Sequence, residues 1–85
     1  MEGKWYVYIL QCSDNTLYTG ITNNLDRRLK AHNAGTASKY TRVRRPVEMV
    51  YREEVETKGD ALRRELQIKA MTRKDKQALV SNKNA

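Results

Sequence analysis

Two short runs of β-branched, aromatic and aliphatic residues lie near the start of the chain. Lys4–Gln11 reads KWYVYILQ and Leu17–Thr22 reads LYTGIT, and both runs have the composition of β-strands. Between them, Ser13–Thr16 supplies residues that suit a tight turn and tolerate a positive φ angle. The pattern therefore predicts a β-hairpin.

A helical spacing of apolar positions follows the hairpin directly. Leu25 and Leu29 are four residues apart and mark the buried side of a helix. One of the three residues at 22–24 can cap its start, and Gly35 stands where a left-handed residue would end it. We expect this first helix to span most of residues 25–34.

The next segment predicts a third strand and a second helix. Pro46–Glu53 alternates in polarity, and Pro46 at its start is a position where a missing N–H is tolerated. Thr57 and Asp60 resemble a capping box that begins a helix running to about Met71. The expected apolar arc of this helix comprises Ala61, Leu62, Leu66, Ile68 and Ala70.

A last short helix is predicted by a second capping pattern. Thr72 and Asp75 repeat the spacing, and the helix should reach about Val80, with Ser81–Ala85 frayed. The predicted order is β-β-α-β-α-α. This order indicates an α+β fold, with a small three-stranded sheet flanked by helices, in one domain over residues 1–85 and an ordered core at about 4–80.

Polar side chains on the buried sides of the two longer helices need a reason. Arg28 and His32 fall on the same side as the leucines of the first helix, and Glu65 lies within the apolar arc of the second. A carboxylate suits Mg²⁺, arginine matches a phosphate, and the hairpin's Tyr8 and Tyr18 offer phenols whose pKa a metal and an arginine can lower. These are the parts of a one-metal phosphodiester hydrolase.

Each of these residues also has a purely structural interpretation. Strand tyrosines commonly pack in the core, Arg28 could extend to water, and His32 could be a half-buried histidine with satisfied hydrogen bonds. Glu65 could form an ion pair with Lys69, four residues later. The residues taken one at a time leave both interpretations open.

Composition and charge narrow the choice of partner. Seventeen Lys and Arg against ten Asp and Glu give a net charge of +7, which is typical of a domain that binds the phosphate backbone of nucleic acid. With one cysteine, Cys12, and one histidine, His32, the chain can form neither an internal disulfide nor a Cys/His zinc site. The longest apolar run, Trp5–Leu10, is too short for a signal peptide or a membrane span, which indicates a cytoplasmic protein.

The joint spacing of these residues resembles the GIY-YIG nuclease superfamily. Tyr6-Val7-Tyr8 is similar to the first tripeptide of that family, and Tyr18-Thr19-Gly20 is similar to the second. Arg28 and Glu65 stand in register with its first-helix motif and its metal-binding glutamate. Lys39–Arg42, ahead of a proline, looks like a segment of short stand-alone bacterial members.

The resemblance implies a Mg²⁺- or Mn²⁺-dependent endonuclease that cuts DNA, and we expect structure-sensitive cleavage in repair or turnover. Glu65 would hold the metal, Arg28 would brace the phosphate, His32 would support the site, and Tyr8 or Tyr18 would serve as or position the base, with Tyr8 preferred. Gly20 would permit a close approach of the backbone. The expected nucleic-acid-binding residues are Arg27, Lys39, Arg42, Arg44 and Arg45.

Two alternative functions remain open, and one residue that the family usually carries is not clearly identified in this sequence. The chain could be a non-catalytic nucleic-acid-binding module of the same fold, or a protein-interaction adaptor whose charge serves solubility. The asparagine that the family usually carries after the glutamate has only Gln77 and Asn82 as candidates. A chain of 85 residues without a second DNA-binding domain would bind nucleic acid weakly, so a protein partner could supply its specificity.

Overall fold

Three antiparallel strands form the centre of the molecule. The computed structural model describes residues 4–83 and contains β1 (Trp5–Gln11), β2 (Leu17–Thr22) and β3 (Glu48–Val55) in the spatial order β2-β1-β3. The predicted hairpin is confirmed: β1 pairs with β2 from Tyr6 opposite Thr22 to Gln11 opposite Leu17. The central strand β1 thus carries the register of the whole sheet.

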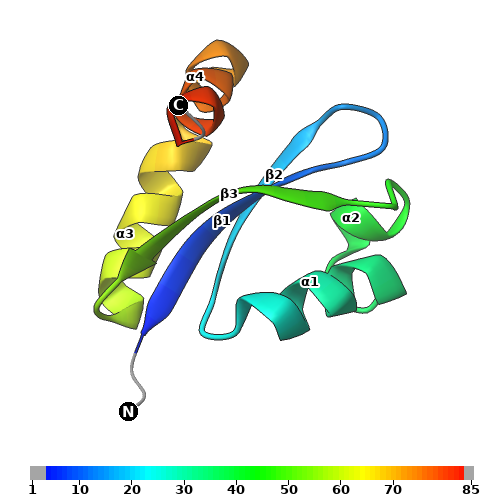
Figure 1. The fold of residues 1–85 in the computed structure, drawn as a ribbon, viewed down its shortest axis with the longest axis horizontal. Helices are drawn as coiled ribbons and strands as arrows, with labels where there is room; N and C mark the ends of the chain where they lie inside the picture. Colours follow the sequence, from blue (N-terminus) through cyan, green and yellow to red (C-terminus); the bar gives the residue numbers. More distant parts are fainter. Residues whose placement is uncertain (1–3, 84–85) are drawn as a thin grey trace.

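Helices cover both faces of this sheet (Figure 1). One face is covered by α1 (Leu25–Ala34) and the short α2 (Lys39–Arg42), and the other by α3 (Lys58–Lys69) and α4 (Arg73–Lys83). The predicted α+β fold and the order of its longer elements are confirmed, and α2 is an addition that the sequence pattern did not predict. Within residues 4–83, every helix lacks the length and apolar content that crossing a bilayer requires.

Alternation along β1 produces two separate hydrophobic clusters. Val7 and Ile9 point to one face and pack with Ala61 and Ile68 of α3. The intervening Tyr8, Leu10 and Cys12 point to the other face and pack with the first helix of the chain; this second cluster comprises Tyr8, Leu10, Cys12, Val47, Tyr18, Leu25, Leu29 and Met49. The site described below grows out of the second cluster.

The predicted helix ends are confirmed by their hydrogen bonds. Asn24 caps α1 by accepting from the Arg27 N–H, and Gly35 ends it with a φ of 84°. Thr57 accepts from the Asp60 N–H at the start of α3. Short-range sequence signals therefore decide where the helices start and stop.

The structure corrects three predicted boundaries of helices and strands. The third strand begins at Glu48 rather than Pro46, because Val47 exchanges both of its backbone hydrogen bonds with the Asn33 side chain of α1. The strand instead continues past Glu53 to Val55. Helix α4 runs to Lys83, so the fraying expected from residue 81 is wrong for 81–83, and residues 84–85 lie outside the described residues.

The predicted apolar arc of α3 is also corrected. Leu62 is 44% exposed and Leu66 is 68% exposed, and Ala70 is exposed as well. The helix docks on the sheet through Ala61 and Ile68, whose seven-residue spacing leaves the two leucines on the outer side.

Gly20 is required by the tyrosine that it faces. Tyr8 pairs with Gly20 across the hairpin, and a Cβ placed on Gly20 would lie 2.6 Å from Tyr8 Oη and 2.7 Å from Tyr8 Cζ. These distances are far below van der Waals contact, so the absence of a side chain at Gly20 makes the space for the phenol ring. The predicted close approach at Gly20 is a contact with the protein's own Tyr8.

We expect Gly20→Ala to destabilise the fold by about 1–3 kcal/mol, because the added methyl group would force the buried Tyr8 ring to move. The matched control is Gly59→Ala in α3, where the nearest atom to a new Cβ is 3.7 Å away. That change should be neutral or stabilising by up to about 1 kcal/mol. Equal free energies of unfolding for the two variants in urea would contradict this account of Gly20.

Candidate active site

A buried histidine links three elements of the fold on the α1 side of the sheet. The Nε2 atom of His32 lies 2.8 Å from Tyr8 Oη, and its Nδ1 atom lies 2.8 Å from Thr41 Oγ1. All three residues are almost fully buried, with exposures of 1%, 1% and 0%. These hydrogen bonds join β1, α1 and α2 through one imidazole ring.

Burial shifts the pKa of both titratable members of this group. The pKa of the Tyr8 hydroxyl is raised, first by burial and next by the charge of Tyr18, with Glu65 adding to the shift and Arg28 opposing it. The pKa of His32 is lowered, first by burial and then by the positive charge of Arg28. Both groups are therefore held neutral around pH 7.

The ring of Tyr18 contacts the rings of both His32 and Tyr40, so it connects the buried hydrogen-bonded group to the surface. Its ring centroid lies 5.2 Å from that of His32 and 5.8 Å from that of Tyr40, which it stacks on at an interplanar angle of 27°. The guanidinium carbon of Arg44 lies 3.9 Å from the centre of the Tyr40 ring. Arg44 Nε in turn donates to Asp14 Oδ2 in the hairpin turn at 3.1 Å, so the ring stack is fixed at both ends.

The charges of Arg28 and Glu65 both act on Tyr8, although the two residues belong to helices on opposite faces of the sheet. Arg28 is half-buried on α1, and Glu65 is half-buried on α3, which packs along β2 at the sheet edge. The charges of Tyr18, Arg28 and Glu65 all contribute to the pKa shift of Tyr8. Groups from three other elements, β2, α1 and α3, therefore influence the Tyr8 hydroxyl.

Glu65 has the chemistry of a single-carboxylate metal ligand. Its side chain is 17% exposed, and its Oε2 atom lies 3.2 Å from Lys69 Nζ. This contact confirms the expected i,i+4 pair, but Lys69 is 52% exposed and such a pair contributes little. Within residues 4–83 no three His, Cys, Asp or Glu residues gather as a ligand set. A single carboxylate is a donor that suits a hard divalent cation, which completes its shell with water and phosphate oxygens.

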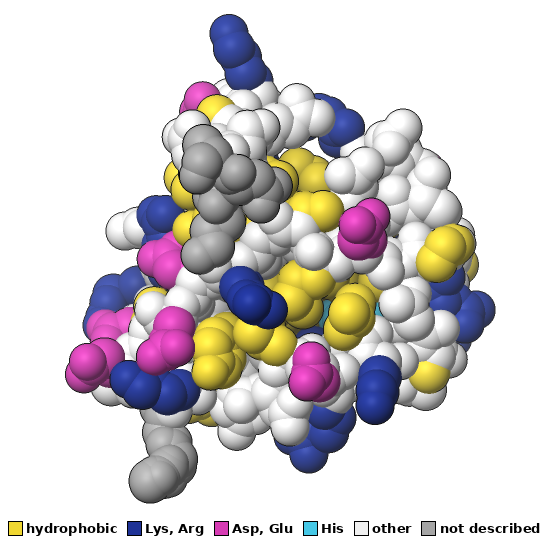
Figure 2. Space-filling view, viewed as in Figure 1, with side chains coloured by type: hydrophobic (Ala, Val, Ile, Leu, Met, Phe, Trp, Pro, Cys, Tyr) yellow, Lys and Arg dark blue, Asp and Glu magenta, His cyan; other side chains and the backbone are white. Residues whose placement is uncertain are grey.

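The basic side chains that the sequence predicts to bind nucleic acid fall into two groups: some donate hydrogen bonds within the protein, and others do not. Arg45 donates to the carbonyls of Arg42 (2.8 Å) and Asn33 (3.4 Å), and Arg44 donates to Asp14 and to the Tyr40 carbonyl. Within residues 4–83, the exposed side chains of Arg27, Lys39 and Arg42 make no hydrogen bond or ion pair. The face in Figure 2 shows Lys and Arg mainly around a hydrophobic centre.

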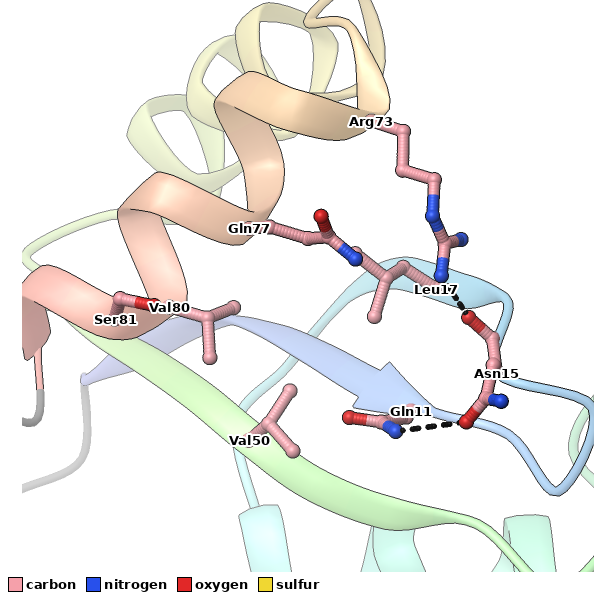
Figure 3. A pocket seen from close by; sticks show the side chains of 8 residues that line it. All are labelled: Gln11, Asn15, Leu17, Val50, Arg73, Gln77, Val80 and Ser81. Atoms are coloured by element: carbon pink, nitrogen blue, oxygen red, sulfur yellow. Dashed lines mark hydrogen bonds between the residues drawn. The ribbon is translucent and has the colours of Figure 1, made fainter.

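A cavity of about 530 Å³ lies elsewhere, between the hairpin turn and α4 (Figure 3). Arg73 donates to the Asn15 carbonyl at its edge, and Gln77 points into it from α4. Its lining residues are Gln11, Asn15, Leu17, Val50, Arg73, Gln77, Val80 and Ser81. None of the five predicted site residues lines this cavity, and Gln77 therefore faces a different part of the molecule.

Two residues of the site were not found from the sequence. Thr41 and Tyr40 belong to α2, which is only four residues long and gives no helical periodicity to detect. The available signal was Ser38, whose side chain caps α2 by accepting from the N–H groups of Tyr40 and Thr41.

The comparison with family models gives one match over nearly the whole chain. The model described as the GIY-YIG catalytic domain matches residues 4–78. The UPF0213 protein CPE1444 of Clostridium perfringens is 56% identical over 79 residues, covering 93% of this chain and 85% of the relative. The UPF0213 protein SH2523 of Staphylococcus haemolyticus is 48% identical, covering 94% and 98%. These relatives are therefore similar to the chain along most of their length.

Two solved structures show the same fold. The solution NMR structure of the UPF0213 protein BH0048 from Bacillus halodurans has a TM-score of 0.62 and 44% identity, covering 94% of this chain and 85% of that one. The solution NMR structure of protein EF2693 from E. faecalis has a TM-score of 0.65 and 41% identity, covering 99% and 92%. The names of these two proteins state no activity.

The lowered pKa of His32 predicts a loss of stability on acidification. The folded protein binds this proton less readily than the unfolded chain, so the free energy of unfolding falls as the pH drops below about 6.5, by at most about 1.4 kcal/mol per pH unit. Protonation would place a second positive charge beside Arg28, next to Tyr8, Tyr18 and Thr41. Urea unfolding at pH 7.5 and 5.5 measures the loss.

The control is His32→Gln, which should show a smaller loss between the same two pH values because the titrating ring is gone. The exposed carboxylates titrate equally in both proteins, so the difference between them reports His32. An equal loss of unfolding free energy in the two proteins would show that His32 is not the group responsible.

Proposed function

The chain belongs to the GIY-YIG family, and from this premise we propose that it is a divalent-metal-dependent endonuclease that hydrolyses phosphodiester bonds in DNA. The observation that carries the proposal is the buried hydrogen bond between Tyr8 and His32, with Tyr18 packed against the histidine ring and with the charges of Arg28 and Glu65 both acting on Tyr8. Ordinary packing does not require two phenols, an imidazole, a guanidinium and a carboxylate to influence one another in this way.

Glu65 is the residue that we propose as the metal ligand. Its partly exposed carboxylate belongs to α3, and its competing ion pair with Lys69 is a weak surface contact. A bound Mg²⁺ or Mn²⁺ would supply Lewis-acid stabilisation of the charge on the phosphate. The protein's own side chains would bind the phosphate and orient the attacking water.

Arg28 is the proposed phosphate contact. Within residues 4–83 its side chain makes no hydrogen bond or ion pair, although it is half-buried and its charge acts on both Tyr8 and His32. A guanidinium held in this way can donate to two phosphate oxygens and stabilise charge that develops during attack by water.

Of the two phenols, we propose Tyr18 as the one that faces the attacking water. The sequence favoured Tyr8, but its hydroxyl is buried and is already bonded to His32. Tyr18 is half-buried and lies between His32 and the exposed Tyr40. In this arrangement Tyr18 orients the water or accepts its proton, and Tyr8 holds the histidine behind it.

Nucleic acid would be held by the unengaged basic side chains, Arg27, Lys39 and Arg42. Such contacts position the phosphate backbone and read no bases. We therefore propose a substrate chosen by its shape, such as a flap or a nick, in DNA repair or turnover in the cytoplasm. A partner protein would add sequence specificity.

We expect Glu65→Gln and Arg28→Ala each to reduce Mg²⁺- or Mn²⁺-dependent nicking of DNA by about 100- to 1,000-fold, because each removes a charge that acts on the scissile phosphate. The assay compares single-stranded, duplex, flap and nicked substrates. Glu56→Gln removes an exposed carboxylate from the loop before α3 and should leave the rate unchanged.

Circular dichroism and urea unfolding establish that each variant is folded. The same residual cleavage by wild type and Glu65→Gln would indicate a contaminating nuclease and overturn the proposal. Binding without any cleavage would favour the non-catalytic nucleic-acid-binding module, and the absence of binding at low salt would favour the adaptor.

The basic segment predicts a specific salt dependence. We expect the double variant Lys39→Ala/Arg42→Ala to bind duplex DNA more weakly and to lower the slope of log K against log salt by roughly 2, because two phosphate contacts are lost. Lys74→Ala/Lys76→Ala, on α4, removes the same charge and should change the slope much less. Equal slopes for the two double variants would place the phosphate contacts elsewhere.

A further inference from the structure

Helix α2 contributes an inward-facing hydroxyl that the proposed reaction does not use directly. Thr41 is completely buried, whereas its neighbours Lys39 and Arg42 are exposed. The Thr41 hydroxyl lies 2.8 Å from His32 Nδ1 and 3.4 Å from the Ser38 carbonyl oxygen. A buried hydroxyl between an imidazole and a carbonyl controls which hydrogen-bonding roles the imidazole can take.

The hydrogen-bond donors of this group can be counted for each neutral form of His32. With the proton on Nδ1, the ring donates to Thr41 Oγ1, the Thr41 hydroxyl donates to the Ser38 carbonyl, and the Tyr8 hydroxyl donates to Nε2. Three donors then meet three acceptors, and each buried polar atom has a partner.

The other tautomer leaves one donor without an acceptor. With the proton on Nε2, the ring donates to Tyr8 Oη, and the Thr41 hydroxyl turns to donate to Nδ1. The Tyr8 hydroxyl hydrogen then has no acceptor among residues 4–83, inside a residue that is 1% exposed. An unsatisfied buried donor is costly, so the first arrangement is favoured.

We infer that Thr41 is a positioning residue for the site: its hydroxyl fixes His32 in the Nδ1–H tautomer and thereby directs the Tyr8 hydroxyl hydrogen onto Nε2. Thr41 touches neither the proposed metal ligand nor the proposed phosphate contact. Its effect on the reaction is exerted through His32 and rests on the proposed function. Its effect on the tautomer does not depend on any activity.

A purely structural role for Thr41 makes a different prediction. If the residue only filled space, valine would replace it, because valine has nearly the same shape and lacks only the hydroxyl. If the hydroxyl selects the tautomer, serine would replace it and valine would not. The pair Thr41→Val and Thr41→Ser therefore separates the two roles.

The first arm measures the His32 ring nitrogens by ¹⁵N NMR in the free protein at neutral pH. We expect wild type and Thr41→Ser to carry the proton on Nδ1, and Thr41→Val to shift toward the Nε2–H form, in which Tyr8 Oη is the acceptor. A wild-type spectrum with the proton on Nε2 overturns the inference without any variant. A folded Thr41→Val protein with the wild-type tautomer also overturns it.

The second arm measures metal-dependent nicking by the same three proteins. We expect Thr41→Val to lower kcat by roughly 10- to 100-fold with little change in KM, as for other residues that orient a functional histidine, and Thr41→Ser to restore most of the rate. An unchanged kcat in Thr41→Val overturns the catalytic part. If wild type shows no nicking, the proposed function fails, and the ¹⁵N spectra still decide whether Thr41 sets the tautomer.

Discussion

The buried imidazole of His32 is the constraint on which the site depends. A histidine with 1% exposure needs a partner for each ring nitrogen, and it finds them on two other elements, at Tyr8 of β1 and Thr41 of α2. Satisfying both nitrogens fixes how α1 and α2 sit against the sheet. The same requirement brings the Tyr8 ring over Gly20, where no side chain is present to obstruct it.

A domain with so thin a core also uses its charged residues as structural parts. Arg44 and Arg45 look like phosphate ligands in the sequence, but they bond to Asp14 and to backbone carbonyls and so hold the hairpin turn, α1 and α2 together. Within residues 4–83, the side chains of Lys39 and Arg42 in the same segment make no hydrogen bond or ion pair. Hydrogen bonds therefore distinguish basic residues of this segment that charge alone does not.

Most of the fold was predictable because its signals are local. The hairpin, the caps at Asn24 and Thr57 and the left-handed Gly35 depend on residues close together in sequence. The exposure of Leu66 was not predictable, because it depends on the angle at which α3 docks on the sheet. The hydrogen bond of Thr41 to His32 was not predictable, because Thr41 lies on a four-residue helix without periodicity.

The proposed metal-dependent site requires Glu65 to hold a divalent ion close to the tyrosines, and a titration with Mn²⁺ followed by ¹H–¹⁵N NMR tests this requirement most directly. Paramagnetic broadening falls steeply with distance from the ion. We expect broadening centred on Glu65 that extends to Tyr18 and Arg28 and disappears in Glu65→Gln. Broadening centred on another carboxylate, such as Asp14, or a pattern that Glu65→Gln leaves unchanged, would contradict it.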